Sequence, residues 1–182
     1  MSAVIRLDRV LQDATALPYR DLITRPTGQA VRQRLVMVLR EVGATYATLD
    51  FSAVGLVDYS CADEIVAKLL AASVEPMPCA GVVLRGLRED HVEAIDHALS
   101  RHGLVVAAFA TDATRPVLLG EAADDWRLAF AAVADLGRAA ATRVADHLAW
   151  PAARTAIALD ALVTMRCLRC HPDATYELGA TA

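Results

Sequence analysis

The sequence predicts an α/β domain followed by a mainly helical domain. Over about the first 110 residues, segments dense in β-branched and apolar residues alternate with segments whose apolar residues recur every three or four positions. From Ala122 to about Arg166 only the helical spacing is present, and a short polar hairpin pattern follows it. Alternating strands and helices are typical of a sheet with helices packed on it. We therefore place one domain at residues 1–115 and a second at residues 121–182.

Apolar density marks the strands of the first domain, and helical periodicity ended by glycine marks its helices. In the segment GQAVRQRLVMVLREVG, for example, Val31, Leu35 and Val38 share one helical face, and Gly43 is placed to end the helix. The expected strands cover residues 4–11, 44–54, 80–87 and 104–111, and the expected helices cover residues 28–43, 60–72 and 88–103.

Helical patterns fill most of the second domain. The segment TRVADHLAW at residues 142–150 is typical of a short helix, and Pro151 suits the first turn of the longer helix that follows. Pro172 and Asp173 then form a turn signal, and an extended segment comes after them. The order predicted here is helix, helix, longer helix and hairpin.

Charge and hydropathy argue against several classes of function. The 182 residues carry a net charge of −4 with a pI near 5.7, so no overall basic field attracts nucleic acid or an anionic membrane. The longest apolar run, residues 104–110, is far shorter than the roughly 20 residues that a membrane helix needs. Arg6, Asp8 and Arg9 interrupt the N-terminal segment, which lacks the apolar core of a signal peptide. We expect a cytoplasmic protein with no membrane partner.

Motifs for catalysis and for nucleotide binding are missing from the sequence. It contains neither a G-x-x-x-x-G-K-[ST] loop nor a G-x-G-x-x-G turn, and no G-x-S-x-G nucleophile elbow. Glu93 and His97 lie one helical turn apart, but no H-E-x-x-H motif accompanies them and spacing fixes no third ligand. We predict no enzymatic activity, no cofactor and no metal site.

The segment CLRCH at residues 167–171 has the spacing that attaches a c-type haem. Such attachment normally takes place outside the cytoplasm, and no second axial ligand stands out. The favoured interpretation is that the spacing arises by coincidence and that the two cysteines are structural. A zinc or redox role for the two cysteines stays open as the less favoured interpretation.

The segment ATLDFSAVGLVDYSCADEIVAKLL at residues 47–70 resembles the STAS domain of sulfate transporters and anti-sigma-factor antagonists. In that family a strand similar to LDFSGV leads through D-S-S-G into a helix. The SCADE piece is still more similar to a STAS-like subfamily of bacterial proteins that carries SFADE. The resemblance covers about residues 27–112 and implies a regulatory protein whose partner is a kinase-like ATPase or a sigma-factor regulator.

The resemblance also implies a serine at the helix start that a partner kinase phosphorylates. Here Tyr59 occupies that position, Ser60 follows it, and Cys61 replaces the glycine of the motif. The regulatory or partner-binding residues carried over are therefore Asp58, Tyr59, Ser60 and Asp63.

Two interpretations of Ser60 remain open beside the resemblance. Serine is a favoured N-cap, and Asp63 three residues later makes a pair similar to a capping box, worth about 1 kcal/mol of helix stability. A phosphate at the same position would be stabilised by the helix dipole. Asp58 is interpreted either as a turn residue or as a carboxylate that binds the partner.

Residues 122–180 resemble a bacterial winged helix-turn-helix, in which a positioning helix, a recognition helix and a wing follow one another. That resemblance implies that Cys167 is a buried apolar residue and that Cys170 and His171 enter the first wing strand and its turn. It also implies DNA binding, with Arg143, Arg154, Thr155 and Arg169 as candidate contacts. Ala152, Ala153, Arg154 and Thr155 are the expected exposed positions at the start of the recognition helix, and only Arg154 is suited to a strong guanine contact.

Charge in the second domain favours a protein partner over DNA. From Glu121 to Ala182 there are eight acidic and six basic residues, whereas most DNA readers present a basic face. We expect a non-catalytic regulatory protein that binds a protein partner through the first domain. A transcriptional regulator that binds DNA through the second domain is the alternative, and homodimer formation stays open.

Overall fold

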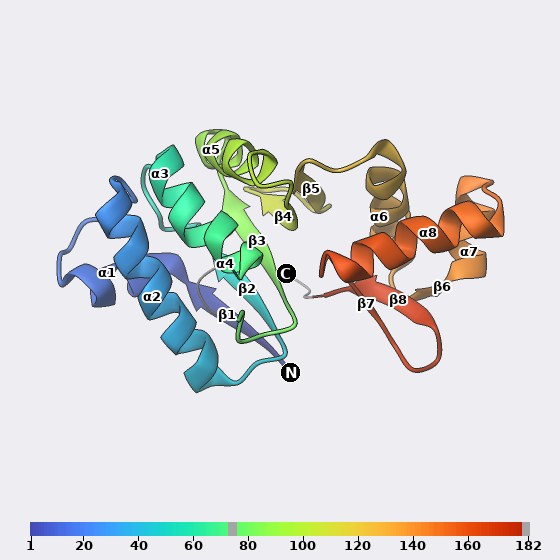
Figure 1. The fold of residues 1–182 in the computed structure, drawn as a ribbon, viewed down its shortest axis with the longest axis horizontal. Helices are drawn as coiled ribbons and strands as arrows, with labels where there is room; N and C mark the ends of the chain where they lie inside the picture. Colours follow the sequence, from blue (N-terminus) through green and yellow to red (C-terminus); the bar gives the residue numbers. More distant parts are fainter. Residues whose placement is uncertain (73–75, 180–182) are drawn as a thin grey trace.

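The computed structural model describes residues 1–72 and 76–179, and its centre is a five-stranded sheet (Figure 1). The strands lie in chain order, with four parallel and the last antiparallel. They are β1 (Ser2–Arg6), β2 (Tyr46–Asp50), β3 (Gly81–Leu87), β4 (Val105–Ala110) and β5 (Val117–Gly120). This mixed sheet with its helices confirms the predicted α/β architecture.

Helices α1 to α5 cover one face of this sheet (Figure 1). Connections between parallel neighbouring strands are right-handed in nearly all proteins, and here each new strand is added on the same side of the last. The connecting helices therefore all fall on one face. They are α1 (Leu7–Thr15), α2 (Arg25–Val42), α3 (Tyr59–Ala62), the π-helix η1 (Asp63–Ala67), α4 (Lys68–Ala71) and α5 (Glu89–Ser100).

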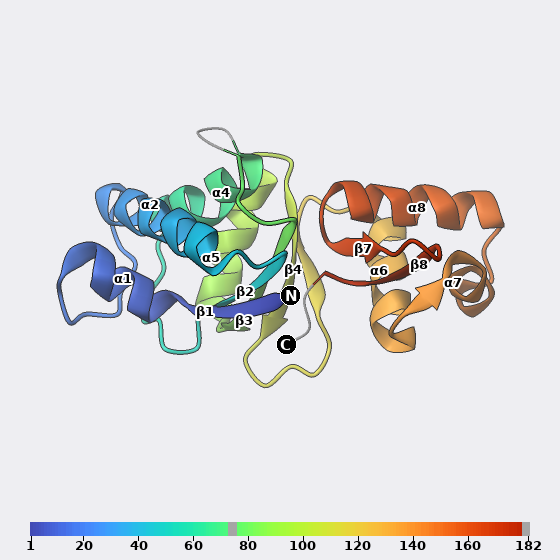
Figure 2. The ribbon, with the colours of Figure 1, turned by 90° about the horizontal axis from the view of Figure 1, so that it is seen from below.

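The remaining elements form a second, smaller layer on the other side of the sheet (Figure 2). In this layer a three-stranded sheet has the order β6-β8-β7. The elements are α6 (Asp124–Leu136), β6 (Ala139–Ala140), α7 (Ala141–Leu148), α8 (Ala152–Thr164), β7 (Leu168–Cys170) and β8 (Thr175–Leu178).

Strand alternation divides the buried residues between two cores. Successive strand residues point to opposite faces, so neighbouring positions of one strand enter different clusters. Ile5, Leu49, Leu84 and Ala108 belong to the cluster under α1 to α5. Val83, Val105, Ala107, Phe109 and Leu118 belong to the second cluster, together with residues of α6, α7, α8 and β7. The second core is thus shared between the five-stranded sheet and the C-terminal elements.

Most predicted elements are present at nearly the expected positions. The helix expected from residue 28 begins three residues earlier, at Arg25, and it ends at Gly43, whose φ is +60°. The helix expected at residues 60–72 is present as α3, η1 and α4 in direct succession. The hairpin after residue 168 is present as β7 and β8.

The strand expected at residues 4–11 is wrong in its second half. Strand β1 ends at Arg6, and α1 begins at Leu7. Leu7, Val10 and Leu11 are buried on one side of this helix, so their spacing of three and four positions, rather than strand alternation, places them in the core.

Strand β5 was not predicted, and it lies at the boundary that we placed at residues 115–121. It pairs antiparallel with β4, with Ala107 opposite Leu118. The last strand of the sheet therefore leads directly into α6. Whether the two predicted domains fold independently stays a prediction.

No helix within residues 1–72 and 76–179 is both long enough and apolar enough to cross a membrane.

Candidate functional site

The N-terminal end of α3 lies at the edge where the parallel strands of the sheet end. Ligands of open α/β sheets bind preferentially at this edge, in loops that follow the strands. Residues 51–58 follow β2 and lead into α3, and residues 16–24 run beside them. The two loops are joined by main-chain hydrogen bonds from Leu22 N to Leu56 O (2.7 Å) and from Asp58 N to Leu22 O (2.9 Å).

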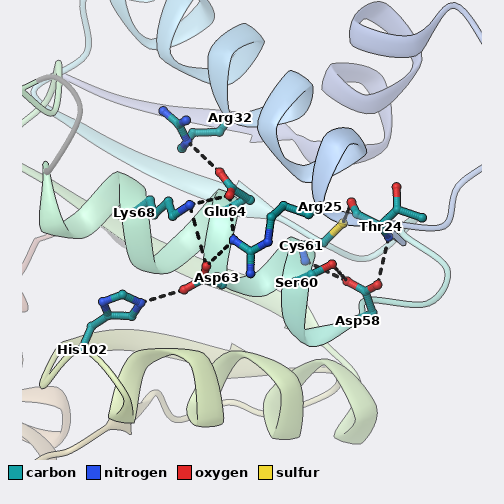
Figure 3. Close-up of polar contacts among 10 residues, drawn as sticks. All are labelled: Thr24, Arg25, Arg32, Asp58, Ser60, Cys61, Asp63, Glu64, Lys68 and His102. Atoms are coloured by element: carbon teal, nitrogen blue, oxygen red, sulfur yellow. Dashed lines mark hydrogen bonds and ion pairs between the residues drawn. The ribbon is translucent and has the colours of Figure 1, made fainter.

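Asp58 is the N-cap of α3 and the centre of a set of hydrogen bonds (Figure 3). Its carboxylate accepts from the Cys61 amide (2.7 Å), the Thr24 amide (2.9 Å) and the Ser60 hydroxyl (2.8 Å). Burial opposes ionisation of Asp58, but these hydrogen bonds outweigh it and lower the pKa of the carboxyl group.

The expectation that Ser60 caps the helix is wrong. Ser60 lies inside the first turn, and its hydroxyl donates to the true cap, Asp58. An aspartate is as good a cap as a serine, and Asp58 also holds the preceding loop through Thr24. Asp63 accepts hydrogen bonds from Arg25 and His102 instead of completing a capping box with Ser60.

Asp63 and Glu64 form a charged network within the π-helical turn (Figure 3). Arg25 Nη1 lies 2.9 Å from Asp63 Oδ2 and 2.8 Å from Glu64 Oε1. Lys68 also pairs with Glu64, and Arg32 Nε lies 3.6 Å from its other oxygen. Single π-helical turns often occur at functional sites.

Gly28 allows the two helices of this network to approach closely. A Cβ atom at Gly28 would lie 2.9 Å from Glu64 Cβ and 3.0 Å from Cys61 Cα. Arg25 and Arg32 are three and four positions away from Gly28, on the same face of α2. Both arginines can therefore reach Glu64, which is only 4% exposed.

A polar hollow of about 450 Å³ opens beside the network. The ring of Tyr59 lies against that of His97, with the ring centroids 4.8 Å apart. A smaller hollow of about 260 Å³ lies on the other side of Tyr59, next to Asp58 and Glu93. The larger hollow is lined by Arg25, Tyr59, Ser60, Asp63, His97, Ala98, Arg101 and His102.

The structure therefore brings together the four residues carried over from the STAS resemblance. Tyr59, Ser60 and Asp63 line the larger hollow, and Asp58 lies beside Tyr59 at the smaller one. Such a surface offers carboxylates, hydroxyls and guanidinium groups for recognition. The adjacent Cys61 thiol is buried, and burial together with the charge of Asp58 raises its pKa to about 12, which keeps it protonated at neutral pH.

The four candidate DNA contacts do not form a basic patch whose charges are all available to DNA. The expectation that Thr155 is exposed is wrong: it is fully buried, and its hydroxyl donates to Pro151 O. Arg154 donates to both oxygens of Asp125, at 2.9 and 2.6 Å, and lies over the Trp150 ring. Arg169 pairs with Glu177, whereas Arg143 is exposed on α7.

The CLRCH segment is divided between the core and the surface. Cys167 is 1% exposed in the second core, and burial raises the pKa of its thiol to about 12. Its predicted burial is confirmed. Cys170 is exposed on β7, and His171 Nε2 lies 3.0 Å from Glu177 Oε1. In the described part of the chain, no group of three or more His, Cys, Asp or Glu side chains could hold a metal ion.

Comparison with known protein families finds no match, and no curated protein is significantly similar to the chain.

Sequence reasoning missed the basic half of the site. Thr24, Arg25 and Arg32 lie far from α3 and η1 in the sequence; Arg25, for example, precedes Glu64 by 39 residues. No local sequence pattern links these two segments. The one local signal was the pair Glu64 and Lys68, which are four positions apart as in an ordinary helical ion pair.

The lowered pKa values of the site predict a loss of stability in acid. The hydrogen bonds and ion pairs described above, working against burial, lower the pKa of Asp58, Asp63 and Glu64. Their contribution is complete above the pKa of the unfolded chain, about 4, and is lost as the pH falls through the lower folded values. We expect the free energy of unfolding, measured by urea denaturation, to decrease steadily below about pH 5.

The Asp58→Asn variant is the matched control for this pH dependence. It keeps the size of the side chain but has no carboxyl group to titrate, so its stability should fall less steeply with acid. Equal slopes in the two proteins would show that Asp58 does not contribute.

Proposed function

We propose that this chain is a non-catalytic regulatory protein that binds a protein partner at the edge of the sheet around α3. The contact region is the Tyr59 surface, which we define as Tyr19, Ile23, Leu56, Tyr59 and Ser60. The resemblance to STAS domains suggests a kinase-like ATPase or a sigma-factor regulator as the partner.

One observation carries the proposal: large apolar side chains are held exposed on two loops that are fixed in place and on the first residue of α3. The exposed fractions are 43% for Tyr19, 45% for Ile23, 57% for Leu56 and 49% for Tyr59. Aromatic side chains on a rigid surface bind partners with little loss of conformational entropy, and tyrosine is enriched among the residues that dominate interfaces.

The rigidity of the loops has identified causes. Arg88 donates to Val54 O (3.1 Å) and Gly55 O (2.7 Å), and the fully buried His91 places Nε2 2.6 Å from the same Gly55 oxygen. Asp21 accepts from the Leu56 amide at 2.8 Å. A Cβ atom at Gly55 would lie 1.9 Å from Asp21 Oδ1, so any side chain there would displace the carboxylate that accepts from Leu56. The surface is therefore formed before a partner arrives.

Phosphorylation of Ser60 fits this proposal as a means of regulation. The phosphate would remove the hydrogen that Ser60 donates to Asp58 and add about −1.5 to −2 charges beside that carboxylate. Arg25 and Arg101 line the same hollow and would attract the phosphate away from Asp58. The charge and the shape of the Tyr59 surface would both change.

The test is the affinity of a partner that has been isolated with the chain and then purified. Tyr59→Ala is expected to weaken binding at least about tenfold because it removes an interface anchor. Ser60→Glu, which imitates the added charge, should weaken binding to a similar extent.

Met37→Ala, an equally exposed apolar position on α2, is the matched control and should bind as the unchanged protein does. A partner insensitive to both Tyr59→Ala and Ser60→Glu would overturn the proposal.

DNA binding through the C-terminal elements is a second candidate, and a specific observation favours it. The order α6, β6, α7, α8, β7, β8 with a β6-β8-β7 sheet supports the winged helix-turn-helix that the sequence resembles. On that alignment α8 would read the bases, but its exposed side carries Ala153, Arg154, Ile157 and Asp160, and Asp125 holds the guanidinium group of Arg154. This composition supports protein binding over DNA binding.

We expect electrophoretic mobility shift at two salt concentrations to show no sequence-specific complex with DNA from upstream of the gene. Sequence-specific binding that weakens steeply with salt and is lost in Arg154→Ala would make DNA the ligand instead.

A further inference from the structure

An apolar hollow of about 640 Å³ lies where the first turns of α6 and α8 meet, away from the Tyr59 surface. Trp126 lines it from α6, and Ile157, which is 70% exposed, lines it from α8. The lining residues are Ala123, Asp124, Asp125, Trp126, Pro151, Ala153, Arg154, Ile157 and Ala158.

A second, smaller hollow lies next to this one. A space of about 240 Å³ between α7 and the start of α8 is lined by Asp146, Trp150 and Ala152, among others. Arg154 of the larger hollow lies over the Trp150 ring of the smaller one, with its guanidinium carbon 4.1 Å from the ring centroid, so the two hollows are neighbours. Together the two hollows make an elongated apolar surface, which suits a polypeptide segment better than a compact ligand.

Carboxylates outnumber cations along this surface. Asp124, Asp125 and Asp146 line the two hollows, and Arg154 is the one arginine that does so among the described residues. Arg154 is held by both oxygens of Asp125, so these two charges neutralise each other. Asp124 and Asp146 give the surface a net negative charge.

We propose that this surface, formed by the two hollows, is the docking site for an amphipathic helix of a partner protein. The helix would place apolar residues one turn apart against Trp126 and Ile157. Its lysine or arginine side chains would lie beside Asp124 and Asp146. A groove that receives an apolar helix face, with complementary charges at its border, is a recurring mode of peptide recognition.

The test uses a synthetic amphipathic helix of about 14 residues, roughly four turns, built from leucine and lysine only. The two tryptophans of the chain, Trp126 and Trp150, both line the surface, so their fluorescence reports docking while the peptide itself is silent. We expect saturable binding with a blue shift of the emission. The same peptide with glutamate in place of lysine should bind at least about tenfold more weakly.

Two variants separate this site from the rest of the molecule. Ile157→Lys should weaken the leucine–lysine peptide at least about tenfold, and the high exposure of Ile157 means that the fold should survive, as circular dichroism would verify. Leu56→Lys makes the same change on the Tyr59 surface and should leave peptide affinity unchanged. Equal affinity in both variants and in the unchanged protein would overturn the proposal.

Sedimentation of the chain alone tests the other occupant. We expect the same sedimentation for the unchanged protein and for Ile157→Lys. A concentration-dependent dimer that Ile157→Lys abolishes would assign the surface to a second copy of the chain and would overturn the partner-helix proposal.

Discussion

Replacing Glu64 with alanine should lower the free energy of unfolding by about 3–5 kcal/mol, the loss typical of breaking a buried ion pair from one side. Glu64 is 4% exposed and is approached by Arg25, Arg32 and Lys68. Arg25 and Lys68 can turn toward Asp63 or toward water. Arg32 cannot, because it is 5% exposed and Glu64 is its ion-pair partner in the described chain.

Chemical denaturation followed by circular dichroism measures this loss. Glu64→Gln keeps the volume and an oxygen acceptor but removes the charge, so it should fall between the unchanged protein and Glu64→Ala. Asp13→Ala is the control for an exposed ion pair with an arginine of α2, Arg34, and should cost less than about 1 kcal/mol. A loss below about 1 kcal/mol in Glu64→Ala would show that Arg32 finds compensation elsewhere.

Replacing Phe130 with alanine should cost about 3–5 kcal/mol, because a large aromatic side chain leaves a cavity in a packed core. Phe130 is 1% exposed in the second core, among residues from both the five-stranded sheet and the C-terminal elements. The shared core predicts that the loss is felt by the whole chain. We expect one unfolding transition before and after the substitution, at lower denaturant concentration in the variant.

Two optical probes test this coupling. Tryptophan fluorescence reports the C-terminal elements alone, since Trp126 and Trp150 both lie there, whereas far-ultraviolet circular dichroism reports every helix. Coincident transitions would show that the two predicted domains unfold together. A fluorescence transition that moves in Phe130→Ala while part of the dichroism signal stays in place would show independent domains.

The elements that sequence reasoning located correctly are those with a strong local signal. Helix α2 has a long periodic pattern and ends at a glycine, and α5 has a similar periodic pattern. Strand β5 has only four residues and no alternation, so its pairing with β4 had no local sign. Residues 4–11 contain β-branched residues, which favour a strand, and apolar residues at helical spacing, which favour a helix. The helix forms from Leu7 onward because it buries Leu7, Val10 and Leu11 in the core.

Only the α3 side of the candidate site was predicted, because only that side has a local sequence signal. Asp58, Tyr59, Ser60 and Asp63 are contiguous and belong to one recognisable motif. Their partners, among them Thr24 and Arg25, come from the start of α2, which is brought near only by the packing of α2 on η1. Asp58 caps α3 in place of Ser60 because of the path of the preceding loop. Residue propensities for the cap position do not predict that path.

The sharing of the second core has a consequence for the growing chain on the ribosome. When Gly120 has been added, all five strands of the sheet exist, but Val83, Phe109 and Leu118 still lack the helices that will cover them. At about 5–20 residues per second, synthesis of the following roughly 60 residues takes about 3–12 s. During that interval the nascent protein presents a half-finished, water-exposed apolar sheet face, which is the kind of surface that molecular chaperones bind.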